Sequence, residues 1–298
     1  SVIPGNCHHT LNTLRSLSLS EPTRLVAVEC EGSTIRFNER SAAAQRAARA
    51  HSRPRAPARA TDDAFLRRFL FARKHDVQQS FELLVRYHQY RREHPELWAP
   101  ADGGVLRALA DGLPGVLAQR DRRGRCVLLM FASNWTPQAC PLMAVYRALL
   151  LTLERTLLDL QNQANGYVII VDWTEFTFKQ SCSLQAKVLK LMIDGLQDCM
   201  PVRFKSIHFI GQPWYVETAL AVIKPYLRAK TRERIVLHGN NLSTLHDALP
   251  LDILPAELGG EGPSYNSERW LNEFYRAESK DNPNYLQNKL SYTCITSY

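Results

Sequence analysis

The segment "GYVIIVD", residues 166–172, is the clearest strand pattern in the sequence. It places an unbroken apolar run between a glycine and an aspartate. Such a run is typical of a strand buried on both faces, as in a parallel sheet covered by helices. Alternation along the strand puts Tyr167, Ile169 and Val171 on one face. The segment therefore predicts the centre of a parallel sheet.

The segments on either side alternate between strand-like apolar runs and helical periodicity. Further strands are expected at "RCVLLMF" (125–131), "KSIHFIG" (205–211) and "RIVLHG" (234–239). Helices are expected between them, over 141–161, 183–200 and 214–227. This βαβαβαβ order predicts an α/β fold with a mostly parallel sheet.

The rest of the chain divides by composition. Residues 61–112 carry three amphipathic helical patterns and are expected to form a small helical domain, followed by the sheet domain over 113–265. Residues 1–60 read as a flexible Arg/Ala-rich extension, and 266–298 as a polar tail with one short helix at 267–274.

Composition restricts the class of protein. The chain has 298 residues, of which 45% are hydrophobic and 22% charged, as in ordinary globular proteins. No stretch is apolar enough to span a bilayer, and no signal peptide is expected. Seven cysteines without a CxxC pair indicate reduced thiols in the cytosol.

The net charge of +8 is concentrated in two regions, 1–61 and 203–234, each with a net charge of +5. An anionic partner is therefore expected, either a membrane surface or a nucleic acid. No aromatic residue lies within 41–61 for base stacking, so nucleic acid is the less favoured partner.

Catalytic motifs are absent from the sequence. There is no GxSxG, GxxxxGK[ST], strand-linked GxGxxG or HExxH pattern. His208 and His238 are expected to be packed, hydrogen-bonded histidines, and Asp172 to cap the turn after its strand. We therefore predict a non-enzymatic protein with no catalytic residues, no metal and no cofactor.

The segment "PWYVETALAVIKPYL", residues 213–227, is apolar around most of a helix and precedes five cations within 224–234. Such a helix needs two apolar neighbours. Both neighbours are protein if it is a central core helix. Alternatively, one is a bound hydrophobic ligand and the other a membrane. Pro225 should bend or end the helix.

Five stretches together resemble one family in order and spacing. They are "DDAFLRRFLFARKHDV", "GYVIIVDWTEFTF", "PVRFKSIHFIGQPW", "IKPYLRAKTRERIVLHGNN" and "ILPAELGG". The chain from about 61 to 265 resembles the CRAL-TRIO lipid-binding family. Within it the clavesin branch is most similar, and the alpha-tocopherol transfer and cellular retinaldehyde-binding proteins are cousins.

This resemblance implies a helical first lobe and a second lobe whose sheet floors an apolar cavity, closed by a gate helix at 214–227. Two serines of the tocopherol protein match Leu149 and Leu153 here, which argues for a more purely apolar cargo. The implied cavity lining is Tyr146, Leu149, Leu153, Tyr167, Ile169, Val171, Leu196, Ile207, Val216, Ala219, Val222 and Ile223.

The resemblance also implies a phosphoinositide site beside the gate. Five positions that hold the headgroup in the tocopherol protein are all cationic here: Arg73, Arg203, Lys205, Lys230 and Arg234. Cations suit this role because each phosphate accepts several charge-assisted hydrogen bonds. The clavesin branch implies phosphatidylinositol 3,5-bisphosphate as the lipid.

The implied function is carriage of a hydrophobic ligand at phosphoinositide-containing membranes. The protein would be cytosolic and peripheral on trans-Golgi and early endosome membranes and clathrin-coated vesicles, acting in endosome and lysosome traffic. One alternative is a retinoid or tocopherol carrier in which phosphoinositide triggers release. Another is an adaptor whose terminal segments recruit clathrin or adaptor proteins while its cavity is vestigial.

Overall fold

The computed structural model describes residues 63–281, without the side chains of 278–281. The prediction for 1–60 and most of that for the carboxyl-terminal tail lie outside these residues. The chain divides into two units, residues 1–66 and 67–298, and the contacts below are those within the second unit.

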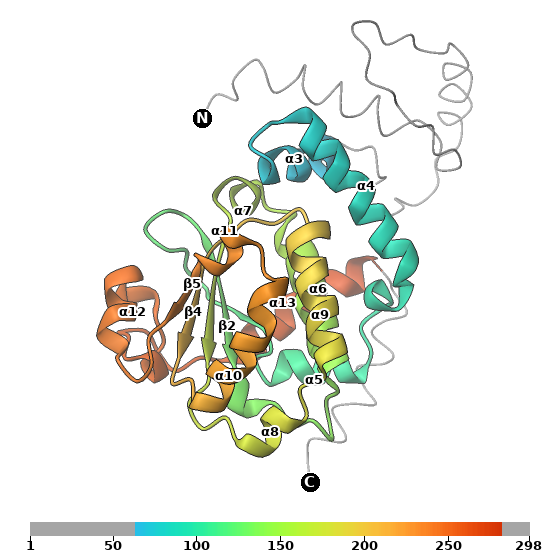
Figure 1. Cartoon of the computed structure of the whole chain (residues 1–298). Coiled ribbons are helices and arrows are strands. Elements are labelled where there is room, and N and C mark those ends of the chain that lie inside the picture. Colours follow the sequence, from blue (N-terminus) through green and yellow to red (C-terminus); the bar gives the residue numbers. More distant parts are fainter. Residues whose placement is uncertain (1–62, 282–298) are drawn as a thin grey trace, which may run out of the picture. The chain divides into compact units, whose positions relative to one another are not determined.

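A five-stranded sheet forms the centre of this unit (Figure 1). The strands lie in chain order, β1-β2-β3-β4-β5; β1 pairs antiparallel with β2, and the other neighbours are parallel. Their bounds are β1 Gly115–Val116, β2 Cys126–Phe131, β3 Tyr167–Asp172, β4 Phe204–Ile210 and β5 Ile235–Leu237. The predicted mostly parallel α/β sheet is confirmed.

Helices connect the parallel strands, as predicted from the alternating pattern. They are α6 Leu142–Thr156, α7 Leu160–Asn165, α8 Phe178–Cys182, α9 Ala186–Asp194, α10 Trp214–Ile223 and α11 Ala229–Arg232. Shorter turns are η2 Ala132–Asn134, η3 Gly195–Cys199 (a π-helical turn that continues α9) and η4 Lys224–Tyr226. The helix α10 ends before Pro225, whose ring cannot continue it.

The two faces of the sheet bury different clusters because alternate residues of each strand point to opposite sides. Val127, Leu129, Val168 and Ile170 pack with α12 (Leu242–Ala248) on one face. Val171 and Met130 face the other side, where α6, α9 and α10 lie. Figure 1 shows α12 on one side of the sheet and these three helices on the other.

The helical segment before the sheet forms as predicted. It contains α3 Asp63–Ala72, α4 Val77–Glu93, η1 Pro95–Trp98 and α5 Gly103–Ala110. Asp76 caps α4 by accepting from the Gln79 N–H at 2.9 Å, and Asp102 caps α5 by accepting from the Val105 N–H at 3.0 Å. Whether this segment and the sheet count as separate domains stays a prediction.

The end of the described chain differs from the predicted polar tail. After η5 Leu251–Ile253 and η6 Ala256–Leu258, helix α13 spans Ser267–Asp281, well beyond the short helix expected at 267–274. Its Trp270 and Phe274 are buried in the core with α5 and α6, and Trp270 Nε1 donates to Thr152 Oγ1 at 3.3 Å. Helix α13 therefore packs on the core formed by α5 and α6.

Candidate functional site

An apolar cavity of about 230 Å³ lies at the carboxyl ends of β2, β3 and β4, between the sheet and the helices α6, α9 and α10. Every side chain that lines it is apolar or aromatic. The lining consists of Leu113, Met130, Ala132, Trp135, Leu142, Val145, Val171, Trp173, Phe176, Leu184, Leu189, Met192, Phe209, Val216, Ala219, Leu220 and Ile223. The cavity can hold an apolar molecule and offers no charged group to it.

Four of the twelve predicted lining residues lie on this cavity: Val171 from β3, and Val216, Ala219 and Ile223 from α10. Others from the sheet and α6 do not line it, because the space between the amino halves of the strands and α6 is filled. Tyr167 hydrogen-bonds Thr156 Oγ1 at 3.0 Å, and Tyr146 hydrogen-bonds Tyr90 at 2.9 Å. The remaining residues off the cavity in this region are Leu149, Leu153, Ile169 and Ile207.

The last two predicted residues lie elsewhere. Val222 is on the outer surface of α10 and is 64% exposed, because two positions along a helix place it about opposite Leu220, which lines the cavity. Leu196 lies in the π-helical turn η3, where the backbone register differs from that of an α-helix. These two residues are therefore not placed to contact a ligand in the cavity.

Four of the thirteen lining residues missed from the sequence are aromatic, and three of these follow the ends of strands. Trp173 comes directly after β3, Phe176 follows β3 by four positions, and Trp135 follows β2 by four positions. Ligands of open α/β sheets bind at the carboxyl ends of the strands, so "DWTEF" and "ASNW" carried a usable signal.

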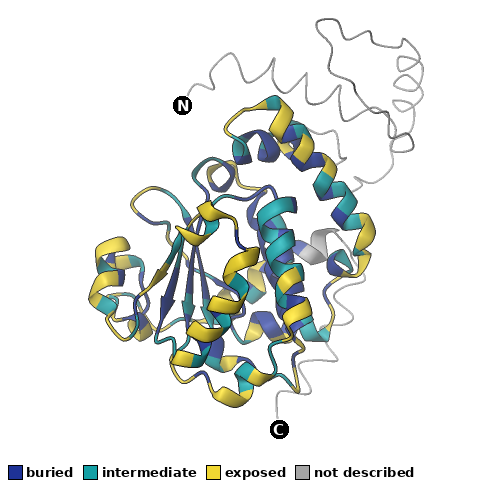
Figure 2. Cartoon of the chain, viewed as in Figure 1, coloured by how far each residue is buried: buried dark blue, intermediate teal, exposed yellow. Residues whose placement is uncertain are grey.

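Helix α10 has two apolar sides. Val216 and Leu220 are buried against the cavity, whereas Trp214 is 69% exposed. The Trp214 ring stacks on Phe178 of α8, which is also exposed, with ring centroids 6.4 Å apart. Figure 2 shows exposed residues along the outer side of α10 and α11. The helix therefore has a ligand cavity beneath it and an apolar surface above it.

Cations gather at the opposite, amino-terminal edge of the sheet. Arg203 immediately precedes β4, Lys205 lies within it, and Arg234 immediately precedes β5. Because β4 and β5 are parallel, their amino ends meet at one edge, and the Ile207 N–H donates to the Arg234 carbonyl at 2.8 Å. The structure brings these three predicted residues together.

The like charges of these cations lie close enough together to lower one another's pKa values. Burial, then Arg203, Arg234, Arg125 and Lys74, lower the pKa of Lys205. Burial and then Arg234 lower the pKa of Arg203. An anion bound here would relieve this repulsion. Lys74 and Arg125 were not predicted, because they come from segments distant in sequence.

Arg203 also has a structural role that the sequence did not indicate. Its Nη2 donates to the carbonyl of Gln163 at 3.2 Å and to that of Ala164, at the end of α7. A cation at the end of a helix is stabilising there. Arg203 therefore stabilises the end of α7 in addition to contributing to the positive surface.

Arg73 and Lys230, the other two predicted cations, are not among the charges that lower the pKa of Arg203 or Lys205. Burial, then Arg86 and Arg228, lower the pKa of Arg73. Lys230 is exposed on α11. We call Arg73, Lys74, Lys205, Arg228 and Arg234 the basic cluster, and it continues the positive surface from β4 and β5 towards η3.

The segment that follows α10, from η4 to the start of α11, is bound to η3. Gln197 Nε2 donates to the Tyr226 carbonyl at 3.1 Å, and the Arg228 N–H donates to Gln197 Oε1 at 2.8 Å. The Arg228 guanidinium forms an ion pair with Asp198. These contacts join η3 to the segment that follows α10.

The candidates for catalysis occupy structural positions, as predicted. Asp172 accepts from the Thr174 N–H at 2.9 Å, and His208 and His238 form a buried pair with nitrogens 2.8 Å apart. Within residues 63–281, no cluster of side chains is suited to hold a metal ion. No helix of that part of the chain is both long and apolar enough to cross a membrane.

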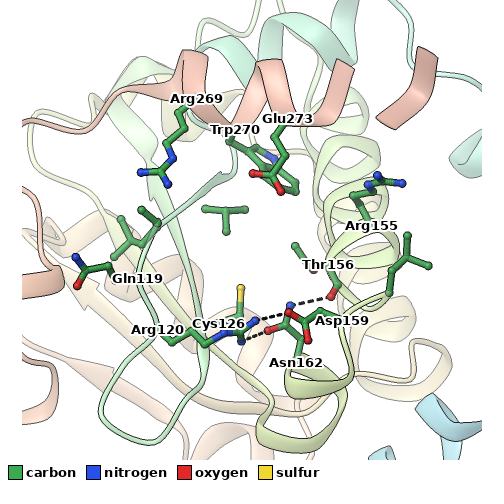
Figure 3. A pocket seen from close by; sticks show the side chains of 14 residues that line it. Gln119, Arg120, Cys126, Arg155, Thr156, Asp159, Asn162, Arg269, Trp270 and Glu273 are labelled. Atoms are coloured by element: carbon green, nitrogen blue, oxygen red, sulfur yellow. Dashed lines mark hydrogen bonds and ion pairs between the residues drawn. The ribbon is translucent and has the colours of Figure 1, made fainter. Parts of the chain in front are cut away.

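A second pocket, of about 340 Å³, lies between β1, α6, α7 and α13 (Figure 3). Its rim carries charges of both signs, including Arg155, Arg269 and Glu273. Arg120 is fixed there by Asp159, at 2.6 Å, and by Asn162. This mixed lining differs from that of the apolar cavity and does not suit a hydrophobic cargo.

Comparison with known proteins agrees with this geometry. Residues 110–260 match the model of the CRAL/TRIO domain, and the chain belongs to the CRAL-TRIO lipid-binding family. It is 44% identical to clavesin-1 of Xenopus laevis over 238 residues, which cover 79% of this chain and 71% of that protein. It is 45% identical to clavesin-2 of Homo sapiens over 228 residues, covering 76% and 70%.

The chain is thus a clavesin-like member of the family, as its sequence predicted. The crystal structure of Sfh5 is similar in fold, with a TM-score of 0.50 at 18% identity, over 70% of this chain and 74% of that one. Membership in a lipid-binding family agrees with the prediction of a non-enzymatic protein.

Proposed function

We propose that this protein carries a hydrophobic ligand in the apolar cavity and exchanges it at membranes that contain phosphoinositides. The observation that carries this proposal is the position of α10. The helix covers the cavity with Val216 and Leu220, exposes Trp214, and is followed by cations of the basic cluster.

Contact with a membrane would involve both the cations of the basic cluster and the exposed aromatic side chains. Each cation near an anionic leaflet contributes about 1 kcal/mol, so Lys205, Arg228 and Arg234 together give weak, reversible attraction. Aromatic side chains such as Trp214 and Phe178 favour the membrane interface. The headgroup would thus bring the outer side of α10 onto the bilayer, where its movement opens the cavity.

The lipid that we propose is phosphatidylinositol 3,5-bisphosphate, by similarity to the clavesin branch. Headgroup contacts are assigned to Arg73, Arg203, Lys205, Lys230 and Arg234. The proposed setting is endosome and lysosome traffic, with peripheral binding of a cytosolic protein to trans-Golgi and early endosome membranes and clathrin-coated vesicles.

The test is binding to vesicles with and without each phosphoinositide. Arg203 is a poor choice for substitution because it also binds the end of α7. Lys205→Gln with Arg234→Gln should reduce binding to the 3,5-bisphosphate, whereas Arg92→Gln with Arg269→Gln, which removes the same charge elsewhere, should not. Equal binding to all anionic vesicles would contradict a specific headgroup site.

Two alternative functions can be tested with the same purified protein and its variants. A retinoid or tocopherol carrier, for which the apolar lining is also suited, would yield such a molecule on organic extraction of the purified protein. An adaptor that recruits clathrin or its adaptors would depend on the terminal segments. The corresponding deletion is 1–60 and 282–298, because removing 266–281 would also remove the buried Trp270 and Phe274.

A further inference from the structure

The turn between α6 and α7 exposes two leucines. Leu158 is 56% exposed and Leu160 is 44% exposed. The turn itself is well ordered, because the last carbonyls of α6 accept hydrogen bonds from the side chains of Asn162 and Gln163, each at 2.7 Å. Both leucines are therefore held on the surface by a turn whose backbone groups are satisfied.

The loop between β1 and β2 exposes two arginines, Arg122 and Arg123. It folds around the buried Asp121, whose carboxylate accepts from the N–H of Arg123 at 2.9 Å and from that of Arg125 at 2.8 Å. Asp121 also forms an ion pair with the Arg125 guanidinium. Its charge is thus matched by Arg125, and the exposed tip of the loop is positive.

Two contacts join this loop to the α6–α7 turn. Arg120 forms an ion pair at 2.6 Å with Asp159, which lies between the two leucines in sequence, and Figure 3 shows this contact. Asn165 Nδ2 at the end of α7 donates to the Gly124 carbonyl at 3.0 Å. The exposed arginines and leucines therefore belong to one ordered part of the molecule. We call Arg122, Arg123, Leu158 and Leu160 the edge patch.

The edge patch lies at the amino-terminal edge of the sheet, because the loop leads into β2 and the turn and α7 lead into β3. Backbone hydrogen bonds join the starts of the parallel strands, from the Cys126 N–H to the Gly166 carbonyl at 3.2 Å and from the Tyr167 N–H to the Arg203 carbonyl at 2.9 Å. Lys205 of the basic cluster lies in β4, two positions after Arg203. The edge patch therefore occupies the same edge as the basic cluster.

Single exposed leucines are ordinary on protein surfaces, whereas apolar side chains beside exposed cations are typical of contacts with a membrane interface. We propose that the edge patch is a second membrane contact, in which Arg122 and Arg123 meet anionic phospholipids and Leu158 and Leu160 enter the interface. This inference rests on the proposed function and adds to it a contact separate from the headgroup site and from α10. The partner is the anionic leaflet around the phosphoinositide.

A bilayer suits all four side chains of the edge patch. Both pairs lie in turns at the ends of strands and helices, where side chains can enter a lipid interface without a matching groove. An acidic protein would attract the same arginines, but it would need a shaped apolar surface for each leucine. The two partners therefore differ in how much binding depends on the leucines.

The test is flotation of the full-length protein with phosphatidylcholine vesicles that contain phosphatidylserine, with and without phosphatidylinositol 3,5-bisphosphate. One variant is Arg122→Gln with Arg123→Gln, and the other is Leu158→Gln with Leu160→Gln. The matched charge control is Arg92→Gln with Arg107→Gln, which removes two exposed arginines from α4 and α5. Each protein is measured at about 50 mM and about 300 mM salt, which changes the screening of exposed charges.

We expect the arginine variant to bind phosphatidylserine vesicles about tenfold more weakly at low salt and to differ much less at high salt, because exposed charges are screened. The leucine variant should bind about tenfold more weakly at both salt concentrations, because burial of apolar surface does not depend on screening. The control should bind like the wild type. Both losses should be the same with and without the bisphosphate.

The outcomes separate this proposal from the proposed function. If both edge-patch variants bind like the wild type, the second contact is refuted, and stronger binding in the presence of bisphosphate would leave the headgroup site intact. If only the arginine variant loses binding, the membrane contact is also refuted, and an acidic macromolecule becomes the partner. If both variants lose binding but the bisphosphate adds nothing to the wild type, the edge patch stands and the specific headgroup site fails.

The fold of each variant is checked by its Tm, which should be unchanged because the side chains are exposed and Asp121 and Asp159 are kept. Should the glutamine pair lower Tm, Leu158→Ala with Leu160→Ala removes most of the same apolar surface and repeats the measurement. Full vesicle binding by that folded alanine pair would overturn the proposal.

Discussion

The Arg228 guanidinium is ion-paired with Asp198, and this pair joins the start of α11, which follows α10 and η4, to η3. Arg228 caps α11 immediately after η4, and Asp198 lies on η3, which continues α9 of the cavity wall. Arg228 also lies close enough to Arg73 to lower its pKa. A phosphate that binds Arg228 in place of Asp198 would therefore weaken the contact between η3 and the segment that follows α10.

Asp198→Asn tests this connection. We expect transfer of a fluorescent lipid from the protein to anionic vesicles to be roughly 1.4- to fivefold faster, the range for loss of an exposed ion pair worth about 0.2–1 kcal/mol. Asp111→Asn is the matched control, because it removes the same charge from the exposed pair with Arg107, away from α10. Equal acceleration in both variants would instead indicate bulk electrostatic attraction.

Lys205→Gln should separate binding from stability. Repulsion by Arg203, Arg234, Arg125 and Lys74 opposes the charge at this position, so its removal should leave Tm unchanged or raise it slightly. The same change should weaken binding to phosphoinositide vesicles. Calorimetric scans and vesicle flotation check the two effects, and a lowered Tm with intact binding would show that Lys205 serves the fold and not a lipid.

The elements of the sheet could be predicted because each depends on a local pattern. The apolar runs of β2, β3 and β4 and the intervening helical periodicities are complete within short windows of sequence. Helix α13 is the exception, because polar residues separate the apolar residues that form its buried side. Trp270, Phe274 and Ala277 share one side of the helix, but the polar residues between them give the segment the composition of a tail.

The cavity was less predictable because its open part depends on contacts between distant elements. The buried side chains of Tyr90, Tyr146, Tyr167 and Thr156 occupy space under α6 and are held by the Tyr90–Tyr146 and Tyr167–Thr156 hydrogen bonds, and no local pattern indicates either bond. The second role of Arg203 has the same origin, since its partners are carbonyls of α7. The cations were assigned through the resemblance to the family, and Arg203, Lys205 and Arg234 flank or enter neighbouring parallel strands.

Two substitutions on α10 test which of its sides faces the cargo. Ala219→Phe should block binding of a fluorescent fatty probe, because the added ring enters the cavity that Ala219 lines. Val222→Phe places the same ring on the exposed outer side and should leave probe binding intact. Titration with the probe measures both. Equal loss of binding in the two variants would show that α10 does not keep this orientation when cargo is bound.

The buried histidine pair predicts a stability that depends on pH. Thr244 donates its hydrogen to the Asn241 carbonyl at 2.9 Å, so its oxygen must accept from His238 Nδ1, which lies 2.6 Å away. His238 Nε2 then accepts from His208 Nδ1, and Ser206 donates to His208 Nε2 at 2.9 Å. Both rings are neutral in this chain of hydrogen bonds, and protonating His238 would set two N–H groups against each other.

Burial, then His238 and Arg125, lower the pKa of His208 to about 4. The unfolded chain therefore takes up the proton first as the pH falls, so stability is full above about pH 6.5 and is lost progressively towards pH 4. The loss should approach about 3 kcal/mol. Urea unfolding at several pH values measures it. His208→Gln should lower stability at neutral pH but flatten the dependence, whereas His246→Gln, which alters a contact with the Leu258 carbonyl, should keep it. An unchanged slope in His208→Gln would assign the acid sensitivity to other groups.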